Sequence, residues 1–295
     1  MNSKVCRSSS LDLQRQLDFL NGYHLRFQHL DWLRETDRVT QAFAYTYLEE
    51  GQIVAMLSTA NDNPTVTWIR YFVASRSNDY NKAFHALLKA AKQDLQTEGI
   101  TKLYALGTSK WFERLLQMND FAPYTEIVQF NTLLDEIISK HLDKKPAISN
   151  ISHLNNDFTM RTMNSEDLDV VYQIDQNSFP PVWQISYKSI QECFKRSSYR
   201  TIISHNNQPV AFLLSETLFN IQHLSRIAVL PSYRRYQIAA TLLVGMIDYA
   251  SSKGITHLTT NTSKDNLPAN NLYARFGFLD TKETLAVYIL NLCQG

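Results

Sequence analysis

The sequence repeats itself, and this constrains the fold more than any other feature. The segment GQIVAMLS (51–58) resembles NQPVAFLL (207–214), and at the same spacing Arg70 aligns with Arg226. Further on, EGITKL aligns with KGITHL at a slightly shorter spacing, as a small loop deletion produces. We therefore expect two copies of one domain in tandem rather than one large domain.

The repeat predicts the domain limits and the fold class. We expect an N-terminal domain over residues 1–145, a linker over residues 146–157 and a C-terminal domain over residues 158–295. The linker region is polar, contains a proline and lacks hydrophobic periodicity. Consecutive hairpins followed by strand, helix, strand, helix and strand indicate an α/β (α+β) fold, in which helices flank a mixed, mostly antiparallel central sheet.

Composition narrows the class of protein. The 295 residues include 29 basic and 28 acidic side chains, with a formal net charge of +1, which gives no reason to expect nucleic acid or a membrane surface as a partner. Cys6, Cys193 and Cys293 are far apart and lack metal-ligand spacing, so we expect a reduced compartment and no metal. Without a leader-like or membrane-spanning apolar run, we expect a cytoplasmic protein.

One short stretch, IAVLPSYRRYQIAATLL, combines a strand, a basic turn and the start of a helix. The first backbone N–H groups of a helix have no internal acceptor, and they form the positive end of the helix dipole. Such a helix start binds anions, pyrophosphate in particular, and Arg234 and Arg235 strengthen it. An ordinary helix start with solvated arginines is the alternative for this segment alone.

A second motif, NLPANNLYARFGF, follows further along the chain. Together with the basic turn it resembles the GNAT family of acetyl-CoA-dependent N-acetyltransferases, so the chain is similar to two tandem GNAT-like domains. SFPPVW resembles the acceptor-side loop of the ribosomal-protein alanine acetyltransferase branch. The resemblance covers residues 158 to 293 directly and the first copy only through the repeat. The positions that match the family's later motif are Asn266, Ala269, Leu272, Tyr273, Gly277 and Phe278.

The resemblance implies acetyl-CoA as cofactor. The turn and helix start are expected to hold its pyrophosphate, and the strand backbone is expected to pair with its pantetheine arm like an added strand. Gln237 departs from the family, which has glycine there so that the backbone approaches the pyrophosphate closely. The expected cofactor-binding residues are Ile227, Ala228, Val229, Arg234, Arg235, Tyr236, Gln237, Ile238, Ala239 and Asn266.

The resemblance also suggests the catalytic residues. Tyr273 is the candidate acid, because a phenol stays protonated at neutral pH; packing in the core is its alternative role. Asn261 stands where the ribosomal-protein branch has a glutamate base. His223 on the preceding strand titrates in the right range and is the candidate base, Glu216 is a weaker candidate, and a histidine without a role or proton loss to solvent stays open.

The first copy lacks these groups. Asn78 and Asp79 stand where the second copy has its two arginines, and Leu116 stands at the position of Tyr273. A carboxylate at the helix start would oppose a phosphate. We therefore expect the first domain to be structural or to contribute to the acceptor pocket, and the active site to lie in the second domain.

Two functions follow as hypotheses. The first is an acetyl-CoA-dependent N-acetyltransferase that acts on a primary amine, either a small molecule or a protein N-terminus. The second is a non-catalytic module that binds or senses acyl-CoA, or serves as a scaffold, on a degenerate GNAT fold. The acceptor amine and the formation of a homodimer are left open by the sequence.

Overall fold

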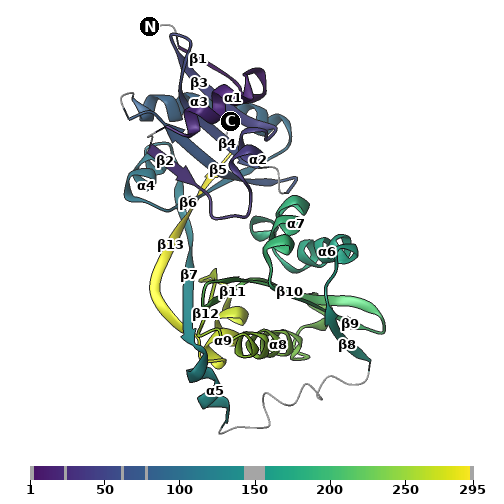
Figure 1. The fold of residues 1–295 in the computed structure, drawn as a ribbon. Coiled ribbons are helices and arrows are strands. Elements are labelled where there is room, and N and C mark those ends of the chain that lie inside the picture. Colours follow the sequence, from purple (N-terminus) through teal and green to yellow (C-terminus); the bar gives the residue numbers. More distant parts are fainter. Residues whose placement is uncertain (1–2, 23–24, 61–62, 77–78, 143–156, 293–295) are drawn as a thin grey trace. The chain divides into compact units, whose positions relative to one another are not determined.

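The computed structural model describes residues 3–22, 25–60, 63–76, 79–142 and 157–292 (Figure 1). The chain forms two compact units. Unit 1 consists of Met1–Thr125 and Leu285–Gly295, and unit 2 of Glu126–Thr284. Each unit is a mixed, mostly antiparallel sheet flanked by helices, which confirms the expected fold class.

Unit 1 is built on a sheet with the strand order β1-β3-β4-β5-β6-β13, and β2 pairs with β5 beside this path. The strands are β1 (Ser3–Arg7), β2 (Leu25–Gln28), β3 (Phe43–Glu49), β4 (Gln52–Ala60), β5 (Val66–Ala74), β6 (Lys102–Gly107) and β13 (Leu279–Asn291). The helices are α1 (Leu13–Leu20), α2 (Glu35–Val39), α3 (Tyr80–Thr97) and α4 (Lys110–Gln117). The centres of β4 and β5 are buried, as their apolar runs require.

Unit 2 has the strand order β7-β12-β11-β10-β9-β8. The strands are β7 (Ala122–Leu133), β8 (Phe158–Thr162), β9 (Tyr199–His205), β10 (Gln208–Leu218), β11 (Ile221–Val229) and β12 (His257–Ser263). The helices are α5 (Leu134–Leu142), α6 (Leu168–Ser178), α7 (Tyr187–Arg196), α8 (Ile238–Ser252) and α9 (Leu267–Arg275), with short 3₁₀ turns at Pro181–Trp183 and Pro231–Tyr233.

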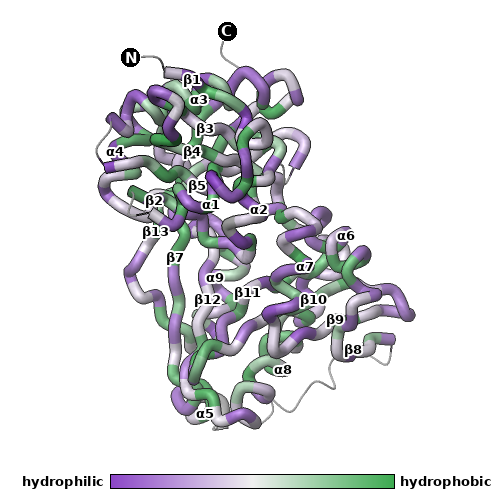
Figure 2. The backbone as a smooth tube through the Cα atoms, turned by 45° about the horizontal axis from the view of Figure 1, so that its top comes forward, coloured by the Kyte–Doolittle hydropathy of each residue, from purple (hydrophilic) through white to green (hydrophobic). Residues whose placement is uncertain are grey.

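The sheet of unit 2 lies between two helical layers (Figure 1). Helices α6 and α7 pack on one face, and α8 packs on the other. Helix α8 is hydrophobic along most of its length (Figure 2), and Leu242, Leu243 and Met246 are buried with Leu213 of β10 and Leu224 of β11. A helix with so few polar positions must be covered, which explains its central place in the core.

Local signals in the sequence predicted the elements of unit 2. The segment FTMRTM forms β8. Asn164 is the predicted cap: its side chain accepts a hydrogen bond from Glu166 N at 2.9 Å, and Asp167 accepts from Asn164 N at 2.8 Å. The expected linker at residues 146–157 lies almost entirely outside the described residues.

Two strands pass from one unit into the other. From Glu126 onward β7 belongs to unit 2, where it pairs antiparallel with β12. From Leu285 onward β13 belongs to unit 1, where it pairs antiparallel with β6. The sheet of each unit therefore contains a strand encoded by the other repeat. The units consequently change at 125/126 and 284/285 and do not coincide with the expected contiguous domains that end at 145 and begin at 158.

The strand register also corrects the repeat alignment. Ala55 and Ala211 align in the sequence repeat. Ala55 pairs with Ala74 of β5 and Ala211 pairs with Val229 of β11, so Ala74 and Val229 are the matching positions of the two strands. Each of these two strands contains a β-bulge, a residue that the register with the neighbouring strand skips. In unit 1 this residue is Arg70, and in unit 2 it is the serine before Arg226. The alignment of Arg70 with Arg226 is therefore wrong by one residue, and Tyr71 is the counterpart of Arg226. Ungapped sequence comparison misses a one-residue shift between neighbouring strands.

The exchanged strand β7 predicts a stability effect. Phe130 is buried, and its ring lies 5.6 Å from the ring of Tyr273. Phe130→Ala should cost ~3–5 kcal/mol in denaturant unfolding, because it removes a buried aromatic ring and leaves a cavity. Asn131→Ala, at the exposed neighbouring position, should change stability by less than about 0.5 kcal/mol. Equal stability of the two variants would show that β7 does not complete the core of unit 2.

Candidate functional site

Strands β11 and β12 begin as neighbours and then part. They run parallel with registered pairs from Ile221–His257 to Leu224–Thr260, and β11 then continues to Val229 beside β10. Within the described residues no registered strand pairing covers the other edge of β11 beyond Leu224. An uncovered edge of this kind can pair with another extended chain that carries amides.

Backbone alternation identifies the groups on this edge. Leu230 N donates to Val210 O at 3.0 Å, on the β10 side of the strand. Because successive N–H groups of an antiparallel strand point to opposite sides, those of Ile227 and Val229 point away from β10. We call this edge, from Ile227 to Val229, the open edge of β11; Ala228 lies between and points its N–H toward β10.

The open edge leads directly into the start of α8. Arg235 and Gln237 both have left-handed backbones, with φ of 71° and 62°, and Tyr236 lies exposed between them. Gln237 is the N-cap residue, yet its side chain makes no capping hydrogen bond. The first N–H groups of α8, including those of Ile238 and Ala239, are therefore left for another acceptor, and such a turn favours an anion.

Gln237 shows how this chain keeps the turn without glycine. The left-handed conformation costs a residue with a Cβ about 1–2 kcal/mol, whereas glycine adopts it without that penalty. Gln237 is exposed, so its side chain extends into solvent rather than into the core. Gln237 thus adopts the left-handed conformation at the cost of this strain.

The two arginines of the turn have different surroundings. Arg234 donates from Nη2 to Ser178 O at 2.8 Å and from Nε to Val229 O at 3.5 Å, so its guanidinium ties the turn to the end of α6. Arg235 is exposed, and no hydrogen bond or ion pair of its side chain is found within the described ranges. Arg235 is therefore the cation that can meet an anion at this turn.

Tyr273 lies where the two strands part. It is buried on α9, close to Thr260 of β12, whose hydroxyl donates to Leu224 O at 3.2 Å. Burial raises the pKa of Tyr273 to about 12, so the phenol carries its proton at neutral pH. Its ring packs 5.8 Å from that of Phe278. Tyr273 is thus a core residue that lies beside the last registered pair of the two strands, Leu224 and Thr260.

His223 lies on the opposite face of the same strand pair. Leu224 faces α8, so by strand alternation His223 faces the layer of α6 and α7. Its Nδ1 lies 2.9 Å from Thr259 Oγ1, and Glu216 is its cross-strand partner on β10. Burial lowers the pKa of His223, which keeps the imidazole neutral at pH 7 and able to accept a proton.

Asn266 has a structural task. As N-cap of α9 it accepts from Ala269 N at 3.4 Å, and its Nδ2 donates to Thr262 Oγ1 at 3.0 Å. These two contacts account for the asparagine as a helix cap. Asn261, at the expected position of a glutamate base, is exposed on β12.

The sequence analysis missed the role of Arg226. Its Nε donates to Asp175 Oδ2 at 2.7 Å, its Nη2 donates to Trp183 O at 2.7 Å, and its guanidinium lies 3.7 Å from the ring centre of Phe179. Asp175 also accepts from Ile185 N at 3.3 Å. Burial raises the pKa of Asp175 and Arg226 opposes this effect. The pair of Arg226 and Asp175 therefore holds the SFPPVW segment against β11. In the sequence, the one signal for Arg226 is that a charged residue stands inside an apolar strand.

These features fit a molecule that carries both an extended amide chain and a phosphate group. The open edge offers backbone partners to the chain, and the start of α8 with Arg235 offers N–H groups and positive charge to the phosphate. Among the described residues, no three His, Cys, Asp or Glu side chains gather as a metal site. None of the described helices is both long and apolar enough to cross a membrane.

Comparison with known proteins points to the same region. The Acetyltransferase (GNAT) family model matches residues 168–278. A putative [ribosomal protein bS18]-alanine N-acetyltransferase of Bacillus subtilis is 25% identical over 120 residues, which are 40% of this chain and 78% of that protein.

Solved structures share the fold of the chain. A probable N-acyltransferase from Enterococcus faecalis is 10% identical with a TM-score of 0.68, over 99% of this chain and 73% of its own. A tandem GNAT protein from the clavulanic acid biosynthesis pathway is 12% identical with a TM-score of 0.55, over 85% of this chain and 83% of its own. At these identities the likeness concerns the fold alone.

The pair of Arg226 and Asp175 predicts strong coupling. Arg226→Met should destabilise the protein by ~3–5 kcal/mol in denaturant unfolding, because it leaves the fully buried Asp175 carboxylate without its counter-ion. The double variant Asp175→Leu/Arg226→Met should be more stable than Arg226→Met alone, since no unpaired charge remains buried. Additive losses in this double-mutant cycle would show that the two side chains do not act as a pair.

Proposed function

We propose that this protein, whose C-terminal region carries a domain of the acetyltransferase (GNAT) family, is an N-acetyltransferase that uses acetyl-CoA and acts in unit 2. The observation that carries the proposal is the open edge of β11, which runs directly into a left-handed turn and an uncapped helix start. Coenzyme A has a pantetheine arm with two amides followed by a pyrophosphate, so its chemistry follows the same order as these features.

The binding residues divide by chemistry. The backbone N–H groups of Ile227 and Val229 are proposed to pair with the amides of the arm, as an added strand does. The first turn of α8 and Arg235 are proposed to hold the pyrophosphate through N–H groups and charge. Arg234 supports the same turn from behind, through its bonds to backbone carbonyls. When bound, acetyl-CoA supplies an acetyl group activated as a thioester.

Proton transfer is assigned to the two faces of the parted strands. Tyr273 holds a proton on Oη at neutral pH, since burial raises its pKa, and it is the proposed donor to the leaving group. His223 is neutral at pH 7, since burial lowers its pKa, and it is the proposed acceptor of the proton from the amine. The two residues flank the last registered pairs of β11 and β12, from opposite faces.

The acceptor is proposed to be the amino terminus of a peptide. The B. subtilis relative is described by its name as acting on an alanine of ribosomal protein bS18, and its similarity supports a peptide acceptor here. Phe179, whose ring lies against the Arg226 guanidinium, and Trp183, whose backbone carbonyl accepts from Arg226, belong to the segment that Arg226 holds. A small primary amine is the alternative acceptor, and a panel of peptides and amines would separate the two.

A non-catalytic acyl-CoA-binding or scaffold protein is the competing proposal. It is favoured by Asn261, which stands where related enzymes would need a carboxylate base, and by the strained Gln237. Binding of acetyl-CoA without thiol release on any member of an amine and peptide panel would support it. Turnover on one member would exclude it.

Acetyl-CoA binding tests the proposed function most directly. Arg235→Glu should weaken the affinity for acetyl-CoA about tenfold or more in calorimetry, because it places like charge at the phosphate site. Lys253→Glu, an exposed position at the other end of α8, makes the same change of net charge and should leave the affinity nearly unaltered. Absence of acetyl-CoA binding by the wild type would refute the function, and equal affinities for both variants would refute the phosphate site.

The two proposed proton carriers predict different kinetic signatures. Tyr273→Phe keeps the ring and removes the proton, so kcat should fall by ~10²–10⁴ while the Kd for acetyl-CoA and the stability change little. His223→Gln should lower kcat similarly at pH 7 but recover as pH rises, because a free amino terminus loses its own proton near ~8. Wild-type kcat in either variant would exclude the residue from proton transfer.

A further inference from the structure

Unit 1 contains the counterpart of the open edge, and there it is covered. Strand β2 pairs antiparallel with β5 from Leu25–Ala74 to Gln28–Tyr71. β4 holds the other edge of β5, and β6 pairs with β5 only as far as Trp68. β2 therefore takes the place beyond the end of β6, which matches the place beyond the end of β12 in unit 2.

The match extends to individual backbone groups. Ser75 N donates to Val54 O at 2.8 Å, on the β4 side, as Leu230 N does to Val210 O in unit 2. By alternation the N–H groups of Phe72 and Ala74 point toward β2. These two residues occupy the register positions of Ile227 and Val229. A segment of the chain itself thus pairs with the edge that we propose to bind pantetheine in unit 2.

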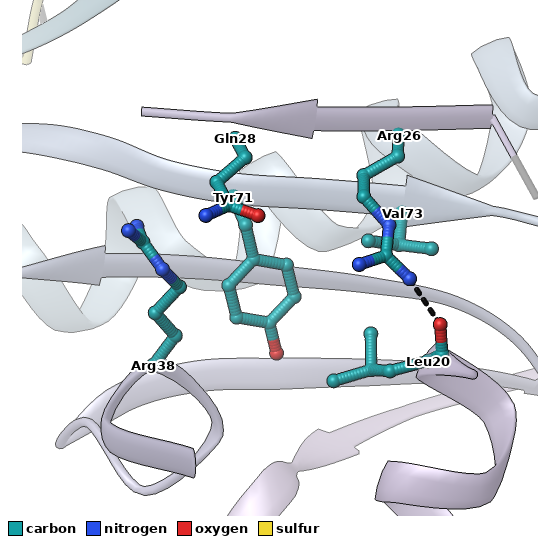
Figure 3. A pocket seen from close by; sticks show the side chains of 6 residues that line it. All are labelled: Leu20, Arg26, Gln28, Arg38, Tyr71 and Val73. Carbon is teal, nitrogen blue, oxygen red and sulfur yellow. Dashed lines mark hydrogen bonds between the residues drawn. The ribbon is translucent and has the colours of Figure 1, made fainter. Parts of the chain in front are cut away.

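β2 is anchored as part of the core. Phe27 at its centre is 1% exposed and stacks on Phe112 of α4 at a ring distance of 3.9 Å. Immediately after β2, His29 N donates to Arg70 O at 2.9 Å. Arg26 at the other end donates to Leu20 O (Figure 3). Side-chain burial and backbone pairing both hold the strand in place, as expected of a permanent occupant.

The helix start of unit 1 is occupied as well. Asp79 is the N-cap of α3, and its carboxylate accepts from Asn81 N at 3.0 Å and from Lys82 N at 3.1 Å. The matching helix α8 has no such cap. The negative charge that a phosphate would bring to α8 is thus supplied in α3 by the chain, and a second anion would be repelled.

A small cavity lies beside β2. The cavity in Figure 3 lies between β2, β5, α1 and α2 and has a volume of about 10 Å³. A cavity of this size holds about one water molecule and no larger group. Its lining residues are Leu20, Arg26, Gln28, Arg38, Tyr71 and Val73.

From these observations we infer that unit 1 is a self-liganded copy of the domain. Residues 25–28 fill the place of the ligand arm, Asp79 fills the place of the phosphate, and the chain has one acyl-CoA site rather than two. The identity of the ligand in unit 2 rests on the proposed function. The covering of β5 by β2 does not, and it can be measured without any ligand.

Amide hydrogen exchange at single-residue resolution on the full chain tests this inference. Without ligand, Phe72 and Ala74 should exchange at least about tenfold more slowly than Ile227 and Val229, because among the described strands a neighbour covers this edge only at the first pair. With saturating acetyl-CoA, exchange should slow at Ile227 and Val229 and stay unchanged at the unit 1 pair. Equal exchange of the two pairs without ligand, or protection of the unit 1 pair by acetyl-CoA, would overturn the inference.

Two variants serve as matched controls. Phe27→Ala should speed exchange at Phe72 and Ala74 about tenfold, whereas Gln28→Ala, at an exposed position of the same strand, should not. If Phe27→Ala does not fold, the comparison of Phe72 and Ala74 with Ile227 and Val229 in the ligand-free wild type still tests whether β2 covers β5. If acetyl-CoA protects neither pair, the proposed function fails while the ligand-free comparison continues to test whether β2 occupies the edge.

Discussion

The parting of β11 from β12 after Leu224 and Thr260 is the constraint on which the candidate site depends. A strand inside a sheet has both edges satisfied, so it can bind nothing through its backbone. Here one edge becomes available over Ile227 to Val229, at the point where the chain turns into α8. The proposed binding groups lie next to the proposed proton carriers, because Tyr273 lies close to Thr260, the last residue of β12 that pairs with β11, and His223 directly precedes Leu224.

Strand exchange makes this geometry depend on the whole chain. Because the two strands part, β11 pairs with β12 only over the first half of β12. The other edge of β12 pairs with β7. β7 also brings Phe130 against Tyr273. The first repeat therefore contributes to unit 2 whether or not it binds a ligand of its own, since its last strand completes the core behind the proposed proton donor.

The sequence predicted the elements and the basic turn, and it failed where partners are distant in the chain. Asn164, α8 and the strand order within each hairpin follow from local signals. The exchange of β7 and β13 does not, because hydrophobic alternation shows that a strand is buried but not beside which strand. The role of Arg226 was missed for a related reason: its partner Asp175 lies on another element, and only the fold brings the two residues together. The role of Asn266 as a helix cap was likewise missed, because the family motif suggested a cofactor contact for this residue instead.

The two units show that one fold can satisfy the same backbone groups in different ways. In unit 1 the segment after the first helix enters the sheet as β2, and an aspartate caps the long helix. In unit 2 the described segment after the first helix forms no strand, Arg226 and Asp175 bind its backbone at Trp183 and Ile185, and the long helix begins without a side-chain cap. The backbone groups of an edge strand and of a helix start both need hydrogen-bond partners. Within the described part of the chain, unit 2 leaves both sets without partners and therefore bears a cost in stability that unit 1 avoids. That asymmetry is the strongest physical reason to place ligand binding in unit 2.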